Sequence, residues 1–394
     1  MGGGEKLFGV LFMASELAEE EMADIARRLV RDSLRIGRRA GGGFEAVRIT
    51  YNSTDDSCVR FALKVEEECW RVGAHTLLIP YSSARRKTFF TLAPEEALAE
   101  MNPMAEALTK TIDVSIYIGE EDDPGWSRGL AGRVRLQAPH RQRLREILDQ
   151  RRVRWAYVGW PIPGAAKGYD CPLERFRQIF FNSIRQSFSE EVKRLCEYYR
   201  RALEGVDQIA IRAEDGTNLT FSIKGRPILV DDAYISEEDV KRGDVGLNIP
   251  SGEVFVAPLE DSANGTIRFE RVAIPGFGKI RGLKLSFRDG RVVDYEALEG
   301  REVFTHFLEA NTGDKDRIAE LGIGCNPGAE YTGGSIIVDE KIYGTLHIAI
   351  GSNTGAYHGR NKASSHLDMI KDMAGGVLLA DGKPIMRNGK PVEA

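Results

Sequence analysis

Histidines and a carboxylate gather near the C-terminal end of the chain. Three of the six histidines fall between residues 344 and 370, and His366 stands two positions before Asp368. Alternate side chains of a β-strand point to the same face, so an H-x-D pair presents an imidazole and a carboxylate side by side. Both groups bind divalent ions of intermediate hardness. The pair indicates either a metal site or an imidazole and a carboxylate that satisfy each other by hydrogen bonding.

A second histidine, His347, lies in the apolar run "GTLHIAIG". If this run is a strand, its leucine and two isoleucines share one face and pack into a core. His347 then faces the other way with Ala349 and Gly351, which leave room beside the imidazole. A lone strand histidine is more often a hydrogen-bonded interior residue than a ligand, so the metal interpretation depends on the H-x-D pair as well. His358, in the loop between them, is expected to be exposed or to face a substrate.

Two glutamates stand in apolar or glycine-rich segments, where a solvated charge is not expected. Glu253 begins a predicted strand in "NIPSGEVFVAP" and follows Gly252, which allows the backbone to approach another group closely. Glu320, in "RIAELGIGCNP", comes just before a Gly-x-Gly segment. Each also has an ordinary interpretation, Glu253 as a polar residue at a strand edge and Glu320 as a surface residue at a helix end. A metal site would need such carboxylates in addition to the imidazoles.

The elements that must position these residues change in character along the chain. In the first half, helical patterns over 59–74 and 94–111, the latter broken near Pro103, alternate with short apolar strands such as 113–119 and 154–161. This alternation predicts an α/β domain with a mainly parallel sheet over residues 1–205.

A long helical stretch, residues 171–206, leads into the second half. Short β-patterned runs follow, separated by DG, NG and PG turns, and "SFRDGRVVDY" predicts a hairpin. Residues 206–394 are therefore expected to form a mixed α+β, β-rich domain that binds the metal. A length of 394 residues also favours two domains.

Composition excludes several classes of partner. Hydrophobic residues make up 42% of the chain and charged residues 29%, and a net charge of -5 provides no electrostatic reason to bind nucleic acid or an anionic membrane. Five cysteines without a CxxC pair argue against a disulfide framework and suit a reducing cytoplasm. The apolar run at the start is interrupted by Ser15 and Glu16, too early for a signal or transmembrane helix. We expect a cytoplasmic protein with no nucleic acid or membrane partner.

Five segments, taken in order, resemble one family. They are "GTNLTFSI", "NIPSGEVFVAP" with "NGTI" behind it, "RIAELGIG", "GTLHIAIG" and "HLD". Together they resemble the aminopeptidase T / aminopeptidase S family of dinuclear metallo-aminopeptidases, most strongly over residues 215 to 370. The first half is similar in texture, with "VRWAYVGWPIPGAA" before the long helix. The resemblance implies a metal-dependent aminopeptidase that acts on peptides, and a homodimer is expected.

Carried over by position, the resemblance implies a set of metal ligands: Glu253, Glu320, His347, His366 and Asp368. Such a set suits two divalent ions, Zn, Co or Mn, that share a bridging carboxylate and a bridging water. Binding of the free α-amine of a peptide to one ion would restrict cleavage to N-terminal residues. Glu320 and Tyr357 are the implied catalytic residues, which assist proton transfer or stabilise the oxyanion.

Besides a shorter loop between the two histidines, the chain departs from the family pattern at three places. The family's acidic pair is Gly252–Glu253 here, Thr354 stands at the offset of its tyrosine with Tyr357 three positions later, and Glu340 is the nearest counterpart of a glutamate before the strand histidine. These departures also suit a rival, because the segments resemble dihydroxypyridine ring-opening dioxygenases, which use one Fe(II). A third alternative is a metal-stabilised binding protein without catalysis.

Overall fold

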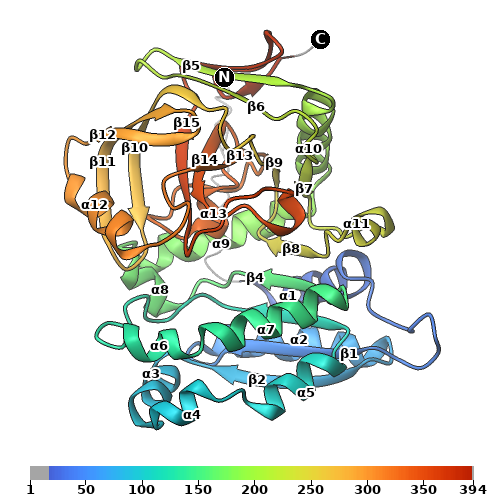
Figure 1. Ribbon diagram of the computed structural model, residues 1–394. Coiled ribbons are helices and arrows are strands. Elements are labelled where there is room, and N and C mark those ends of the chain that lie inside the picture. The colour runs from blue at the N-terminus through green and yellow to red at the C-terminus, as the bar shows by residue number, and fades with distance from the viewer. Residues whose placement is uncertain (1–16, 393–394) are drawn as a thin grey trace, which may run out of the picture.

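The structure is a computed structural model that describes residues 17–392, so the apolar run at the start of the chain lies outside the described residues. The two halves are stacked, with the first half (blue to cyan) below the second (yellow to red) in Figure 1. Helix α9 (Leu173–Ser187) lies between them. Within residues 17–392, no helix combines the length and the apolar character needed to cross a lipid bilayer.

A five-stranded parallel sheet with the order β2-β1-β3-β4-β8 organises the first half. Its strands are β1 (Ala46–Asn52), β2 (His75–Tyr81), β3 (Val114–Ile118), β4 (Arg154–Val158) and β8 (Gly246–Ile249). The helices around it are α1 (Glu19–Arg27), continued by a π-helical turn (Arg28–Ser33), α2 (Asp56–Arg71), α3 (Ser83–Leu92), α4 (Glu95–Ala99), α5 (Pro103–Thr111), α6 (Ala131–Leu136), α7 (Ala138–Gln150) and α8 (Pro163–Gly168). The predicted α/β fold with a mainly parallel sheet is confirmed.

Local sequence signals account for the helix ends. The carboxylate of Asp55 accepts hydrogen bonds from the first backbone N–H groups of α2, and Asn102 does the same for α5. The predicted break near Pro103 therefore separates α4 from α5. The long helical stretch is two helices, α9 and α10 (Glu190–Leu203), and the hydroxyl of Ser189 caps the second one.

Two antiparallel sheets make up the second half. The eight-stranded sheet has the order β12-β11-β10-β6-β5-β16-β17-β18, and the five-stranded sheet has the order β15-β14-β13-β9-β7. The strands are β5 (Gln208–Ala213), β6 (Asn218–Ser222), β7 (Leu229–Asp231), β9 (Glu253–Val256), β10 (Asn264–Ile274), β11 (Gly278–Arg288), β12 (Arg291–Glu296), β13 (Ile318–Gly324), β14 (Thr345–Gly351), β15 (His366–Asp372), β16 (Gly376–Ala380), β17 (Lys383–Arg387) and β18 (Lys390–Pro391). The helices are α11 (Glu237–Arg242), α12 (Arg301–Ala310), α13 (Ile336–Asp339) and a 3-10 turn (Gly355–Tyr357). The predicted hairpin is present between β11 and β12, where Asp289 and Gly290 adopt positive φ values of 48° and 78°.

Two features cross the expected division after residue 205. The apolar face of α10, with Val192 and Tyr199, packs in the hydrophobic core of the second half rather than the first. Strand β8, from the second half, pairs in parallel with β4 and completes the first sheet. The backbone groups of β8 form hydrogen bonds with those of β4, which would otherwise be an open edge of the sheet. The division after residue 205 stays a prediction.

Candidate metal centre

The pairing of β13, β14 and β15 places two carboxylates in one row across the sheet. Glu320 pairs with Ala349, and Ala349 pairs with Asp368. Directly paired side chains of neighbouring strands share a face, and adjacent strands lie about 4.8 Å apart. The small side chain of Ala349 leaves a space between the two carboxylates.

The histidines occupy neighbouring positions on the same face, each opposite a glycine. His347 lies opposite Gly322, and His366 lies opposite Gly351. A Cβ atom on Gly322 would lie 2.0 Å from Cε1 and 2.1 Å from Nε2 of His347. The glycine is therefore required by the position of the imidazole, while the apolar side chains of β14 point into the core behind the sheet.

Glu253 joins the group from β9. It pairs with Gly324 of β13 at the strand's first residue. Gly252 before it has a φ of 119°, a conformation that favours glycine, and a Cβ atom there would lie 3.0 Å from Cβ of Asn326. The family pattern has an acidic residue where this chain has Gly252. The backbone conformation at Gly252 is one that an acidic residue rarely adopts.

The side chains converge on a small volume. The Nε2 atom of His347 lies 3.2 Å from Oε1 of Glu320, 3.8 Å from Oε2 of Glu253 and 4.0 Å from Oδ1 of Asp368. The Nε2 atom of His366 lies 3.2 Å from Oε2 of Glu320 and 3.2 Å from Oδ1 of Asp368. The structure therefore brings together all five residues that the sequence predicts as ligands.

A second acidic group borders the first. Donor atoms of Glu253, Glu340 and His347 lie within 4.8 Å of one another, as do those of Glu320, His347 and Asp368. His347 belongs to both groups, so the two groups of donor atoms meet at its imidazole. Glu340 follows α13 and is the glutamate that the sequence offered as a counterpart of the family residue.

Sequence reasoning missed a buried cation beside these carboxylates. The ammonium of Lys341 is fully buried and lies 2.5 Å from Oε1 of Glu253, 2.8 Å from Oε1 of Glu340 and 3.2 Å from Oδ2 of Asp231. Asp231 ends β7 and was missed as well, although the two acids in "ILVDDAY" directly after an apolar run were a usable signal. No comparable signal marks Lys341, because a lysine that follows two acidic residues, Asp339 and Glu340, is usually exposed.

The electrostatics of the group keep Glu320 and the two imidazoles in opposite charge states. Burial alone would raise the pKa of Glu320, but its contacts with His347 and His366 hold that pKa well below its usual value. Burial alone would lower the pKa of His347, but Glu320, Asp368 and Glu253 raise it to about 9. In the metal-free protein the protons on the two imidazoles therefore balance the charge of Glu320, and metal binding must displace them.

The donor set fits divalent cations. Oε2 of Glu253 is buried and has no hydrogen-bond partner among residues 17–392, and it faces the imidazole of His347. A buried carboxylate oxygen without a partner is costly unless a cation binds it. Three carboxylates and two imidazoles on one sheet face are ligands typical of Zn, Co or Mn sites.

Tyr357 lies beside the group. Its ring centroid is 5.5 Å from that of Phe255 and 6.1 Å from that of His366. Burial and the carboxylates of the site raise the pKa of Tyr357 well above its usual value, so the phenol stays protonated. Thr354, at the family tyrosine's offset, is exposed, and His358 is exposed as expected.

The loop that carries Tyr357 is held by Glu260. The carboxylate of Glu260 accepts hydrogen bonds from Nη2 of Arg226 at 2.7 Å and from the backbone N–H of Arg360 at 2.6 Å. Within the loop, Oδ1 of Asn353 accepts a hydrogen bond from the backbone N–H of Asn361 at 2.8 Å. A loop between two strands of the site is thereby ordered by buried polar contacts.

Comparisons with known proteins agree with this geometry. A match to the thermophilic metalloprotease (M29) family covers residues 41–390. The chain is 38% identical to aminopeptidase 2 of Geobacillus stearothermophilus over 285 residues, which is 66% of this chain and 67% of the relative. Wild-type AmpT from Thermus thermophilus has a similar structure, with a TM-score of 0.74, 21% identity and coverage of 94% of this chain and 99% of AmpT.

The rival group also has a solved structure. The 2,5-dihydroxypyridine dioxygenase of Pseudomonas putida KT2440 is similar with a TM-score of 0.62 and 15% identity, covering 96% of this chain and 99% of the dioxygenase, which shows a shared fold alone. The comparisons confirm the family resemblance drawn from the sequence segments and, with it, a metal-dependent aminopeptidase. The chain belongs to the thermophilic metalloprotease (M29) family.

Proposed function

We propose that the chain releases N-terminal amino acids from short peptides with two divalent ions, Zn, Co or Mn, held by the predicted ligands. These are Glu253, Glu320, His347, His366 and Asp368. The observation that supports this proposal is their convergence from four strands on one sheet face, where Oε2 of Glu253 has no hydrogen-bond partner among the described residues and faces His347. When bound, such ions activate a water and polarise a carbonyl.

The protein's own residues supply orientation and proton positions. Glu320, ionised and in contact with both imidazoles, fixes their relative orientation. Tyr357 keeps its proton, so its hydroxyl can donate a hydrogen bond to the oxyanion that develops on the substrate carbonyl. Glu320 also assists proton transfer. The side chain of His366 is 29% exposed, which leaves this side of the site open to a peptide.

Hydrolysis of leucine p-nitroanilide and of a leucine dipeptide tests the proposal. Chelated protein should be inactive, activity should return with Zn, Co or Mn, and elemental analysis should find two ions per chain. Activity should be absent in Glu320→Ala and unchanged in Glu309→Ala, which alters an exposed glutamate on α12. Equal cleavage of free and N-acetylated peptides would contradict the binding of the α-amine. Oxygen consumption with a dihydroxypyridine and Fe(II), without peptide cleavage, would favour the dioxygenase instead.

A further inference from the structure

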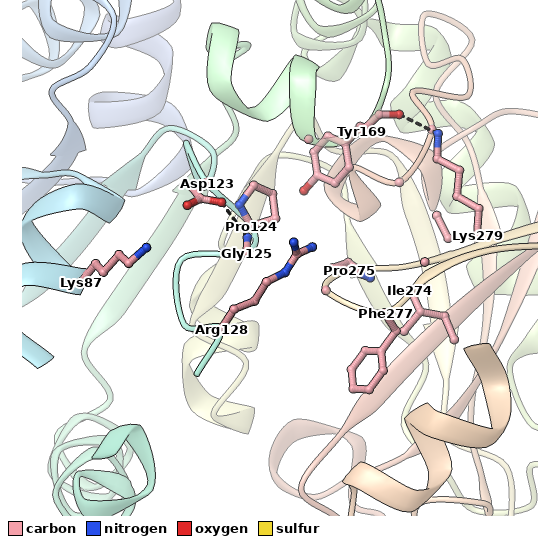
Figure 2. Close-up of a pocket in the computed structure, with 16 residues that line it drawn as sticks. Lys87, Asp123, Pro124, Gly125, Arg128, Tyr169, Ile274, Pro275, Phe277 and Lys279 are labelled. Atoms are coloured by element: carbon pink, nitrogen blue, oxygen red, sulfur yellow. Dashed lines mark hydrogen bonds between the residues drawn. The ribbon is translucent and has the colours of Figure 1, made fainter. Parts of the chain in front are cut away.

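A cavity of about 450 Å³ lies between the two halves, apart from the metal centre (Figure 2). Lys87 of α3 and the loop after β3, from Asp123 to Arg128, form its wall on the first half. The turn between β10 and β11, residues 274–278, closes it from the second half, with Tyr169 at the junction. Both halves therefore contribute to one space.

The topology of the parallel sheet places this cavity where α/β folds bind ligands. In the order β2-β1-β3-β4, the connections leave β1 and β3 in opposite directions along the sheet, and ligands bind beyond the carboxyl ends of strands at such a point. Directly at the strand ends, Nδ2 of Asn52 donates to the carbonyl of Glu120 and to Oδ1 of Asp122, both at 3.0 Å. These contacts lie at the strand ends, next to Asp123, which is the first residue of this loop to line the cavity.

The cavity carries an excess of positive charge. Lys87, Arg128 and Lys279 line it against one acidic residue, Asp123. The ion pairs found among residues 17–392 involve neither Lys87 nor Arg128, and Lys279 lies 3.8 Å from the exposed carboxylate of Asp170. Figure 2 shows Arg128 reaching from its loop into the space between the halves. An anionic group is the complement of such a surface.

A short segment of the chain joins the lining of the cavity to the metal centre. Gly334 lines the cavity, and its backbone N–H donates to Oδ2 of Asp339 at 3.1 Å. The next residue, Glu340, belongs to the acidic group around His347. Six residue steps bound the separation of Gly334 from Glu340 at roughly 20 Å, since an extended chain spans at most about 3.6 Å per residue. Because this is an upper bound, an extended peptide of about five or six residues is long enough to reach from one to the other.

We propose that this cavity binds the terminal carboxylate of a short peptide whose N-terminal residue lies at the metal centre. The inference rests on the proposed aminopeptidase function and assigns the first half a role in substrate binding. The exposed side chain of Phe277 and the neighbouring Pro275 would contact the apolar part of the last residues. Peptides that end in a carboxylate and are long enough to reach the cavity should bind better than their amides.

The first test compares alanine peptides of about two to about eight residues, each as free acid and as C-terminal amide. The KM of the amide should exceed that of the acid about threefold to fivefold, the effect of an exposed charge pair, from about five residues upward and not for dipeptides. Arg128→Ala and Lys87→Ala should abolish the difference, whereas Arg135→Ala, an exposed arginine on α6 outside the cavity, should preserve it. Equal KM values for acid and amide at every length would overturn the proposal while leaving peptide hydrolysis intact.

A binding measurement separates this proposal from the function on which it rests. N-acetylated pentaalanine, as acid and as amide, is titrated into the full chain by calorimetry, because blocking the amine prevents turnover. The acid should bind about threefold to fivefold more tightly, and Arg128→Ala should remove that preference. Identical affinities would refute the carboxylate site whether or not the protein cleaves peptides. Absence of cleavage with an intact preference for the acid would refute the aminopeptidase function alone.

Discussion

Replacement of Lys341 by methionine tests how the buried charges beside the metal centre are held. The ammonium is fully buried and contacts the carboxylates of Asp231, Glu253 and Glu340 at 2.5 to 3.2 Å. Burial alone would lower the pKa of Lys341, but these carboxylates raise it well above its usual value, so the ammonium is charged. Methionine keeps an apolar stem of similar length and removes the charge, which leaves three buried carboxylates facing one another.

The expected loss of unfolding free energy is about 3 to 5 kcal/mol, the range for removing one partner of a buried charge network. The measurement is urea unfolding followed by circular dichroism, near neutral pH and with chelator present. Added Zn or Mn should restore part of the stability in Lys341→Met, because a bound cation stabilises the folded state and balances the same carboxylates.

Lys371→Met is the matched control. Lys371 is also a buried lysine, but it contacts one carboxylate, that of Asp215, at 2.8 Å, and the Asp215 side chain is 40% exposed. Water can hydrate that carboxylate after the substitution, so the loss should be at most about 1 kcal/mol. If Lys341→Met in chelator is as stable as the wild type, or loses no more than Lys371→Met, the three carboxylates do not depend on the ammonium.

Two further substitutions probe the packing of the imidazole and a buried acid of the first half. Gly322→Ala should lower metal affinity at least about tenfold in equilibrium dialysis, because the new Cβ would lie 2.0 Å from the His347 ring. Gly132→Ala is the control, since a Cβ there would have no atom within 4 Å, and it should leave the affinity unchanged. Unchanged affinity in Gly322→Ala would show that the ring can move without cost. Burial raises the pKa of Glu120 from 4.5 to about 7, so its contribution to stability is fully present below about 4.5 and is lost as pH rises through about 7. Unfolding at several pH values should therefore show the wild type losing about 3 kcal/mol relative to Glu120→Gln between these limits, and a pH-independent difference would mean that Glu120 titrates normally.

Local patterns in the sequence were sufficient for much of the fold and for the residues of the site. Alternation of polar and apolar residues identified β14 and the face on which His347 lies, and the DG turn identified the β11–β12 hairpin. The proline at residue 103 marked the break between α4 and α5, because a proline acts on the residues next to it in the chain. The order of five short segments indicated the ligand set, and the structure brings those side chains together.

The tertiary structure alone decided how these pieces meet. The register that aligns Glu320, Ala349 and Asp368 depends on three strands packing against one core, and a shift of one residue would turn each side chain to the opposite face. Local patterns likewise did not indicate that β8 pairs in the first sheet, that α10 packs in the second core or that Lys341 is buried. They arise from contacts between residues distant in sequence. Pairing an open sheet edge, burying an apolar face and neutralising a buried charge each contribute more free energy than local conformational preference.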